Sequence, residues 1–209
     1  MQKIMFEHRR FGLEQAVIAG TKTMTRRRIH FPGINDADVE SEEMGIDEKG
    51  RVYYAFYTRN EDMVVYPKYQ IGEEVAIAQC YKDADVDPHS IVAMVDEGQN
   101  MFTPVPAVDS EGWNNKMFVR ADLMPHVIEI TDIKTERLQD ISDEDCLREG
   151  ITKWLDCYIV TSIMEHHGQN NVCFDTPREA FAAIINALNG RVTWERNEWQ
   201  FAYTFKLVK

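Results

Sequence analysis

Residues 198–209, EWQFAYTFKLVK, alternate between polar and apolar side chains. Successive side chains of a β-strand point to opposite faces, so this alternation predicts a half-buried antiparallel strand. Its apolar face comprises Trp199, Phe201, Tyr203, Phe205 and Leu207. Aromatic residues in this pattern can stack on nucleic-acid bases, but packing in a core is their commoner use. We expect the strand to line a barrel or a sheet.

The segment before this strand carries the clearest helix signal in the chain. Thr176 is suited to cap the helix, Pro177 to take its first position and Glu179 to complete a capping box, while Gly190 marks the end. The apolar residues Phe181, Ile184, Ile185 and Leu188 share one face. We expect this helix, residues 177–189, to cover the sheet that contains the last strand.

Weaker signals predict the remaining elements. A short helix is expected over residues 11–19, ending at Gly20, and another from Ser142 to Gly150. β-Strands are expected in residues 21–28, 51–59, 69–82 and 116–138. Residues 36–48 hold seven acidic side chains and are expected to form a solvated loop. The fold class that follows is α+β, mainly β.

Length and composition limit the class of protein. At about 150 residues per domain, a chain of 209 residues predicts one domain with insertions or about one and a half domains, large enough to need neither disulfides nor a metal. The four cysteines, Cys80, Cys146, Cys157 and Cys173, form no C-x-x-C pair and are expected to be reduced. Charged residues interrupt the N-terminus, and no apolar run approaches the roughly 20 residues of a membrane span. We expect a cytoplasmic protein without a membrane partner.

Charge is distributed unevenly along the chain. The formal net charge is −12, which argues against binding of long polyanions. Residues 1–30 nevertheless contain seven Lys and Arg and only two acids, a local charge of +5 that leaves −17 for the other 179 residues. Arg26, Arg27 and Arg28 can donate paired hydrogen bonds to phosphate. Alternatively, they pair with the acidic segment 36–48.

The same basic stretch contains a lysine among threonines. Positive neighbours and burial both disfavour the ammonium form of Lys22, which can then accept a proton from a threonine hydroxyl such as that of Thr25. In a continuous strand these two side chains would point to opposite faces, so they meet only if the chain turns between them. The competing interpretation is an ordinary surface strand that is rich in threonine.

Other polar residues give weaker evidence for a catalytic or metal-binding site. His166 and His167 are adjacent and lie between Cys157 and Cys173 in the sequence, but their spacing fits no zinc motif, and we expect neither a metal nor a cofactor. Glu149 closes the helix that begins at Ser142. A carboxylate in the last turn is unfavourable with respect to the helix dipole, which makes a functional role more plausible there.

Four segments together resemble one known family. They are residues 20–27, GTKTMTRR, which match a G-x-K-x-x-T-x-R signature; residues 69–73, YQIGE; residues 136–150, from Glu136-Arg137-Leu138 to Glu149-Gly150; and residues 194–199, which end in Asn197-Glu198-Trp199. In this order they resemble the activating signal cointegrator homology (ASCH) domains, a branch of the PUA-like β-barrels. Glu198 departs from the family's usual proline. The resemblance covers about half of the chain.

The resemblance implies a fold and an activity. The fold is a single PUA-like domain over residues 1–209, a small antiparallel β-barrel with flanking helices and insertions at about 31–68, 83–115 and 151–175. The activity is hydrolysis of the amide of N4-acetylcytidine, with Thr25 as nucleophile, Lys22 as base and Glu149 as its partner. Arg27 would hold a polar or phosphate group of the ligand. The alternative is a module that binds RNA or a nucleotide without turnover through the basic turn of residues 22–28, with Thr23, Arg26, Arg27 and Arg28 as its binding residues.

Overall fold

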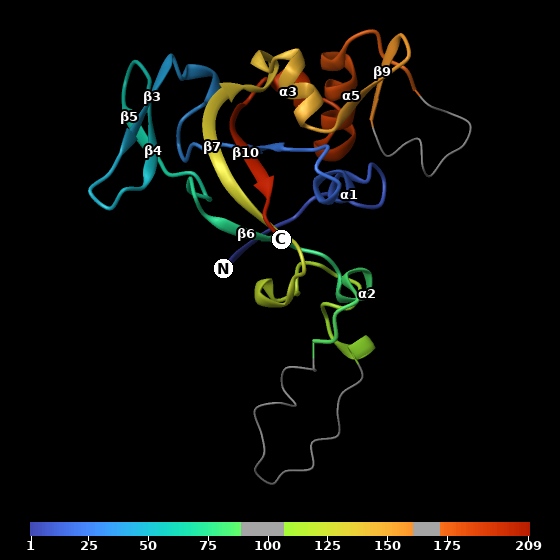
Figure 1. Ribbon diagram of the computed structural model, residues 1–209. Coiled ribbons are helices and arrows are strands. Elements are labelled where there is room, and N and C mark those ends of the chain that lie inside the picture. Colours follow the sequence, from blue (N-terminus) through green and yellow to red (C-terminus); the bar gives the residue numbers. More distant parts are fainter. Residues whose placement is uncertain (89–106, 161–171) are drawn as a thin grey trace. The chain divides into compact units, whose positions relative to one another are not determined.

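The computed structural model describes residues 1–88, 107–160 and 172–209. These residues form ten strands in three sheets and five α-helices, which confirms the α+β class (Figure 1). The chain divides into two compact units. The first consists of Met1–Phe6, Glu74–Ile128 and Leu207–Lys209, and the second of Glu7–Glu73 and Glu129–Lys206.

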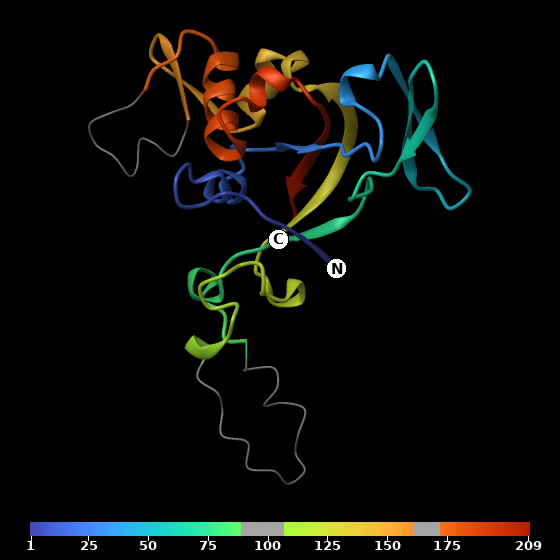
Figure 2. The ribbon, with the colours of Figure 1, turned by 180° about the vertical axis from the view of Figure 1, so that it is seen from behind.

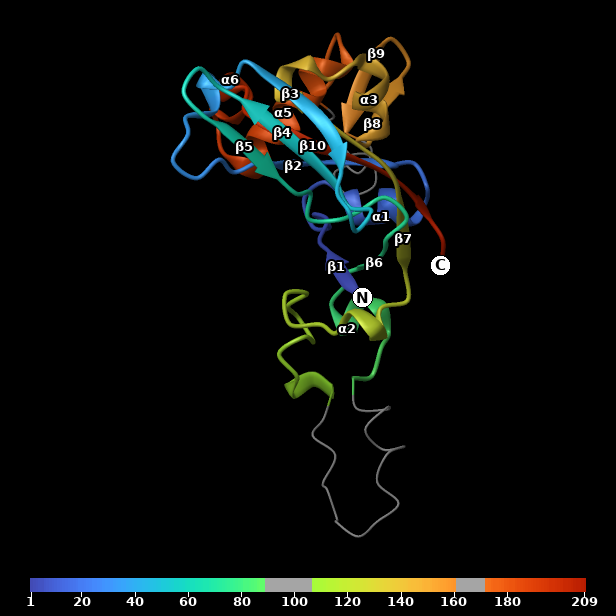
Figure 3. The same cartoon turned by 90° about the vertical axis from the view of Figure 1, so that its left-hand side faces the viewer.

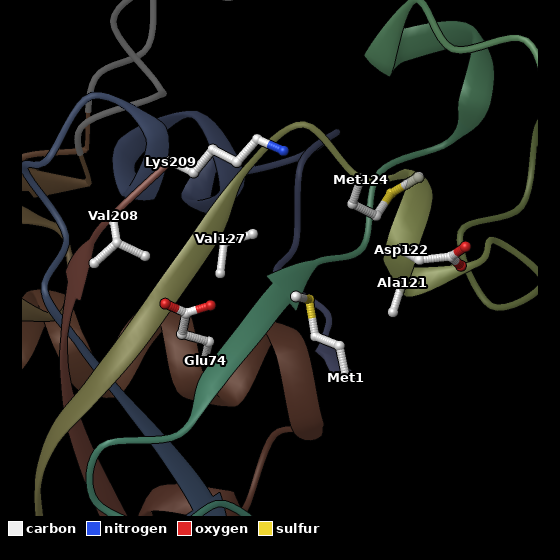
Figure 4. A pocket seen from close by; sticks show the side chains of 8 residues that line it. All are labelled: Met1, Glu74, Ala121, Asp122, Met124, Val127, Val208 and Lys209. Carbon is white, nitrogen blue, oxygen red and sulfur yellow. The ribbon is translucent and has the colours of Figure 1, made fainter.

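The first unit is built around a short parallel strand pair. Strand β1 (Gln2–Ile4) pairs with β6 (Glu74–Ile77). Helix α2 (Tyr81–Ala84) and the 3-10 helices η3 (Ala107–Asp109) and η4 (Ala121–Leu123) follow. Its core contains Ala76, Ala78, Tyr81, Val119 and Met124. An open pocket of about 300 Å³ in this unit is lined by two methionines and two carboxylates, among other residues (Figure 4).

The second unit holds most of the secondary structure. Its helices are α1 (Leu13–Ile18), η1 (Asp36–Asp38), η5 (Leu138–Asp140), α3 (Asp143–Arg148), α5 (Pro177–Asn189) and α6 (Thr193–Arg196). Its strands are β2 (Met24–Arg28), β3 (Ser41–Ile46), β4 (Val52–Tyr57), β5 (Asp62–Val65), β8 (Ile151–Trp154), β9 (Cys157–Val160) and nearly all of β7 (Val127–Arg137) and β10 (Trp199–Leu207).

The strands belong to sheets of five, three and two strands. Their orders are β1-β6-β7-β10-β2, β3-β4-β5 and β8-β9. Among the described residues the five-stranded sheet ends at β1 and β2 and does not close into a barrel. Within the second unit, β10 and β2 pair in antiparallel fashion, with Thr25 opposite Tyr203 and Arg27 opposite Phe201.

Strands β10 and β2 lie between two layers of the second unit. The three-stranded sheet lies on one side of them and helices α3 and α5 on the other, as the views from front, back and side agree (Figures 1, 2 and 3). On the first side, the rings of Tyr54 and Phe201 lie 5.7 Å apart and those of Phe56 and Trp199 5.6 Å apart. On the second, Arg148 of α3 donates to Thr204 at 3.1 Å.

This layering corrects the prediction for the last strand. Its span, Trp199–Leu207, agrees with the sequence, but the strand is not simply half-buried. Gln200 and Ala202, on the face opposite the aromatic side chains, are also buried, because the helices cover that face. Only toward the C-terminal end, at Lys206 and Leu207, does the strand reach solvent.

The acidic segment 36–48 is not the loop that its composition predicts. It forms η1 and strand β3, which pairs along its whole length with β4. Its carboxylates pair with arginines outside the basic turn. The pairs are Asp36 with Arg137, Glu40 with Arg59 and Asp47 with Arg51.

The helix signals of the sequence are confirmed at their ends. Thr176 and Glu179 form the reciprocal capping box at the start of α5. Ser142 accepts a hydrogen bond from the backbone of Asp145 at the start of α3. Gly20, after α1, has a φ of 75°, in the left-handed region that favours glycine.

Two of the four cysteines correct the expectation of reduced thiols. Cys157 and Cys173 form a disulfide, with their Cα atoms 5.5 Å apart, whereas Cys80 and Cys146 are buried thiols. The bond ties the β8–β9 hairpin to the chain that leads into α5. Within the described part of the chain, no helix is long and apolar enough to cross a membrane.

Candidate functional site

Lys22 lies in the short connection between α1 and β2. The backbone N–H groups of Thr21 and Lys22 both donate to the carbonyl of Ala16 at 2.9 Å, which fixes this connection to the end of α1. The N–H of Thr23 donates to the carbonyl of Arg148 at 2.9 Å, which ties it to the end of α3. Because Lys22 precedes the strand, its direction is not set by strand alternation relative to Thr25.

The side chain of Lys22 is buried against Glu149. Its Nζ lies 2.5 Å from Oε2 of Glu149 and 2.7 Å from the carbonyl oxygen of the same residue. The next residue, Gly150, has a φ of 103°, in the left-handed region that favours glycine. The structure thus brings together two of the three residues that the sequence predicts to be catalytic.

Burial governs the protonation of Lys22. Only 2% of the residue is exposed, and loss of hydration lowers the pKa of its ammonium group below the ordinary range. The charge and hydrogen bond of Glu149 oppose this effect, while the charges of Arg27 and Arg26 add to it. The neutral amine is therefore easier to form at Lys22 than at a lysine in water.

Glu149 is the C-cap residue of α3. A carboxylate at this end faces the negative pole of the helix dipole. Two cations offset that cost, since Oε1 accepts from Nη1 of Arg26 at 2.8 Å while Oε2 accepts from Lys22. Both carboxylate oxygens are therefore occupied by charged donors.

Strand alternation separates the three consecutive arginines. Arg26 lies opposite Ala202 and faces the helices, where its guanidinium contacts Glu149, Glu136 and Asp145 and lies 5.6 Å from the ring centre of Phe181. Its side chain is 2% exposed. The structure therefore places Arg26, which the sequence suggests as a ligand-binding residue, in an internal ion-pair network.

Thr25 and Arg27 lie on the other face of β2. Nη1 of Arg27 donates to Oγ1 of Thr25 at 2.7 Å, and Thr25 is buried. Burial lowers the pKa of Arg27, opposed by the charges of Glu149, Tyr69 and Tyr203. The charge of Arg27 also acts on Glu149 and Lys22. Within the described residues, Thr25 makes no hydrogen bond to either of them, so the structure does not join it to the lysine–glutamate pair.

The two remaining binding candidates differ in exposure. The side chain of Arg28 is 56% exposed and pairs with Glu198 at 2.9 Å. Thr23 is half-buried, and its carbonyl accepts from the N–H of Phe205 at 3.0 Å. The ion pairs of Arg26 and Arg28 are thus made with acids outside the segment 36–48, contrary to the alternative interpretation of the basic run.

Sequence analysis does not single out three further charged residues that lie at the site. These are Glu136, Asp145 and Lys134. Lys134 pairs with Glu136 at 2.9 Å and with Asp145 at 2.6 Å. Burial raises the pKa of Asp145, but the hydrogen bond from Lys134 and the charges of Lys134, Arg26 and Arg148 outweigh it and lower the pKa. Asp145 resembles an ordinary residue of the first helical turn in the sequence, and only tertiary contact shows its second role.

The described residues offer no candidate metal site. Within residues 1–88, 107–160 and 172–209, no group of three or more His, Cys, Asp and Glu side chains is arranged to hold a metal ion. His166 and His167 lie outside these residues, so the interpretation of that pair stays a prediction.

Comparison of the chain with models of protein families, with curated proteins and with solved structures found no match.

Proposed function

We propose that this protein is an amidohydrolase that removes the acyl group from an N4-acylated nucleoside such as N4-acetylcytidine. The observation that carries the proposal is the buried Lys22–Glu149 pair, in which the lysine loses its proton more readily than a lysine in water. Thr25, which accepts a hydrogen bond from Arg27, supplies the nucleophile. The resemblance of residues 20–27 to the ASCH signature supports the same roles, and with them a PUA-like domain.

The proposed reaction has two halves. The neutral amine of Lys22 accepts the hydroxyl proton of Thr25 as Oγ1 attacks the carbonyl carbon of the substrate amide. Lys22 then donates this proton to the leaving N4 nitrogen as the carbon–nitrogen bond breaks, and cytidine departs. Water hydrolyses the acyl ester on Thr25, which releases acetate and restores the hydroxyl.

Arg27 and Glu149 assist these steps in different ways. The guanidinium of Arg27, 2.7 Å from Oγ1, stabilises negative charge on that oxygen. Glu149 orients Lys22 and keeps its ammonium form stable enough to return the proton. The first step requires Oγ1 of Thr25 to come within hydrogen-bond reach of Nζ, which contacts Glu149 in the resting structure.

Lys22→Met tests the proposed base. The purified full chain is incubated with N4-acetylcytidine, and cytidine is measured by liquid chromatography. We expect the wild type to release cytidine and Lys22→Met to lose at least about 100-fold in kcat. The control is Lys206→Met, which removes an exposed lysine paired with Glu129 and leaves activity unchanged. Absence of turnover on a panel of acylated nucleosides, or full activity of Lys22→Met, would contradict the proposal.

Recognition without turnover is the alternative outcome. It assigns ligand contacts to Arg27 and Arg28, since Arg26 is engaged internally. A short single-stranded RNA would then bind with an association constant that falls as salt is added. In a plot of its logarithm against the logarithm of the salt concentration, each phosphate contact makes the slope steeper by about 0.7. Binding of this kind together with an inactive wild type would favour the alternative.

A further inference from the structure

Arg26 holds together carboxylates from two elements. Its guanidinium contacts Glu136 at the end of β7 and both Asp145 and Glu149 on α3, the last through Nη1 at 2.8 Å. A planar guanidinium presents five N–H donors in a fixed fork, so it can hold three carboxylates at once in a defined geometry. Arg26 therefore ties the end of α3 to β7, as Lys134 does through Glu136 and Asp145.

The orientation of Glu149 depends on this contact. Arg26 occupies Oε1 and Lys22 occupies Oε2, so a rotation of the carboxylate would break one of two charge-assisted hydrogen bonds. Without Arg26, Oε1 would lose its donor, and the carboxylate would be free to turn both oxygens toward Lys22. Arg26 thus sets the position of the Glu149 carboxylate at Lys22, although these hydrogen bonds do not join Arg26 to Lys22 or to Thr25.

We propose that Arg26 is a positioning residue of this site, which fixes the Glu149 carboxylate and thereby controls how strongly Lys22 holds its proton. The catalytic consequence rests on the proposed function, whereas the control of Lys22 protonation does not. Arg26 occupies an unspecified position of the signature that residues 20–27 resemble, so its role is inferred from its contacts alone.

The charges around the pair determine the sign of the effect. Lys22 faces Glu149 from α3 and the arginines Arg26 and Arg27 from β2. Arg26 in turn faces Glu136 and Asp145, and Cys146 of α3 lies within range of its charge. Asp145 also pairs with Lys134 and Arg148. Removal of Arg26 takes away a positive charge that repels the Lys22 ammonium. It also leaves Lys22 as the remaining cation at the Glu149 carboxylate, so both changes make Lys22 bind its proton more strongly.

The protonation of Lys22 can be followed directly by NMR. The Nζ signal of Lys22 in the uniformly ¹⁵N-labelled full chain is assigned by its loss in Lys22→Arg and titrated against pH. We expect Arg26→Met to raise the midpoint by about one pH unit. Arg26→Lys keeps the charge but not the fork, and we expect its midpoint to return most of the way to that of the wild type.

Two further variants separate charge coupling from loosening of the site. Glu136→Gln removes a negative charge next to Arg26, so we expect the Lys22 midpoint to fall, opposite to the change in Arg26→Met. Entry of water into a loosened site would raise the midpoint in both. Arg148→Met breaks another ion pair of Asp145 without touching Glu149, and we expect no shift. An unchanged midpoint in Arg26→Met, or an equal rise in Glu136→Gln or Arg148→Met, would overturn the proposal.

Kinetics then test the consequence for catalysis. If the wild type is active, the acidic limb of kcat/KM against pH should move up in Arg26→Met by the same shift as the NMR midpoint. We expect Arg26→Lys to keep the wild-type profile while kcat falls about tenfold, because Glu149 is less well oriented. If the wild type is active and Arg26→Met leaves the pH profile of kcat/KM unchanged, the catalytic part of the proposal is refuted. An inactive wild type would refute the proposed function and leave the NMR result to decide the role of Arg26.

Discussion

Glu149 is the residue on which the site depends. It closes a helix whose dipole disfavours a carboxylate, yet it is buried, with a cation on each of its oxygens. Burial of such a group is tolerated only when all its partners are present, because an unpaired charge in the interior is costly. The same arrangement leaves Lys22 dehydrated and its pKa lowered.

Glu149→Gln should therefore destabilise the protein strongly. It leaves Lys22 and Arg26 facing each other without the shared negative charge, and we expect a loss of about 3–5 kcal/mol in the free energy of unfolding. Glu129→Gln is the matched control, since Glu129 pairs with the exposed Lys206, and we expect a loss below about 1 kcal/mol. Urea unfolding measures both, and equal losses would show that the Glu149 pairs add little.

The buried thiol of Cys146 contributes to the stability of the folded protein, and this contribution is lost at alkaline pH. Burial raises the pKa of its thiol to about 12, whereas the thiol of an unfolded chain titrates near 9. A raised pKa contributes stability that is complete below pH 9 and is lost as the pH rises toward 12. We expect Cys146→Ala to lose less unfolding free energy than the wild type between pH 8 and pH 11. Identical pH dependence in the two proteins would contradict this.

At the residue scale, the sequence predicted part of the site. Lys22 and Glu149 were candidates because of a signature and an unfavourable helix end, and the structure brings them together. Arg26, Arg27 and Arg28 are consecutive and alike in local sequence, which predicts a ligand contact for all three. The environments of these arginines differ because successive side chains point to opposite faces of β2 and different elements cover the two faces. Only the tertiary fold determines which elements these are.

At the scale of elements, local signals predicted helices and the last strand well. Helix α5 and helix α3 begin at the expected caps, because capping depends on residues within one turn. Strand β3 was missed because its acidic sequence has no strand signal of its own, and its pairing with the aromatic strand β4 stabilises it. The burial of Gln200 and Ala202 was missed for the same reason, since the helices that cover them are distant in sequence.

The capping box of α5 can be tested by a single substitution. Thr176→Ala removes the side chain that accepts from the N–H of Glu179, and we expect a loss of about 1 kcal/mol in unfolding free energy. Thr21→Ala is the control, because Thr21 is exposed and its hydroxyl lies at the C-terminal end of α1 and not at the N-terminus of a helix. A Thr176→Ala variant as stable as the wild type would show that the cap contributes nothing.

The disulfide makes a further prediction at this scale. Alkylation of the unfolded chain should modify two cysteines before reduction and four after it, with Cys157 and Cys173 as the added sites. Closing a loop of this length in the unfolded chain is worth about 3 kcal/mol, so Cys157→Ser with Cys173→Ser should lower the unfolding free energy by about that amount. Four modified cysteines before reduction would contradict the bond.

At the scale of the whole molecule, charge restricts the partners. The net charge of −12 opposes long polyanions, and the positive residues of the first 30 positions are partly neutralised, since Arg26 and Arg28 both pair with carboxylates. We expect a random-sequence DNA duplex to bind with a Kd above about 100 µM at physiological salt. Tight, salt-dependent binding of such a duplex, measured by fluorescence anisotropy, would contradict the proposal of a site for a small nucleoside.

The most direct test of the account is the rate of cytidine release from N4-acetylcytidine by the full-length wild type and Thr25→Val, with Thr21→Val as control. Thr21 offers the same change four residues away, and its hydroxyl donates to the carbonyl of Ala16 at the end of α1. We predict release by the wild type and Thr21→Val and a loss of at least about 100-fold in Thr25→Val. Equal rates in Thr25→Val and the wild type, or no release by the wild type, would contradict the account.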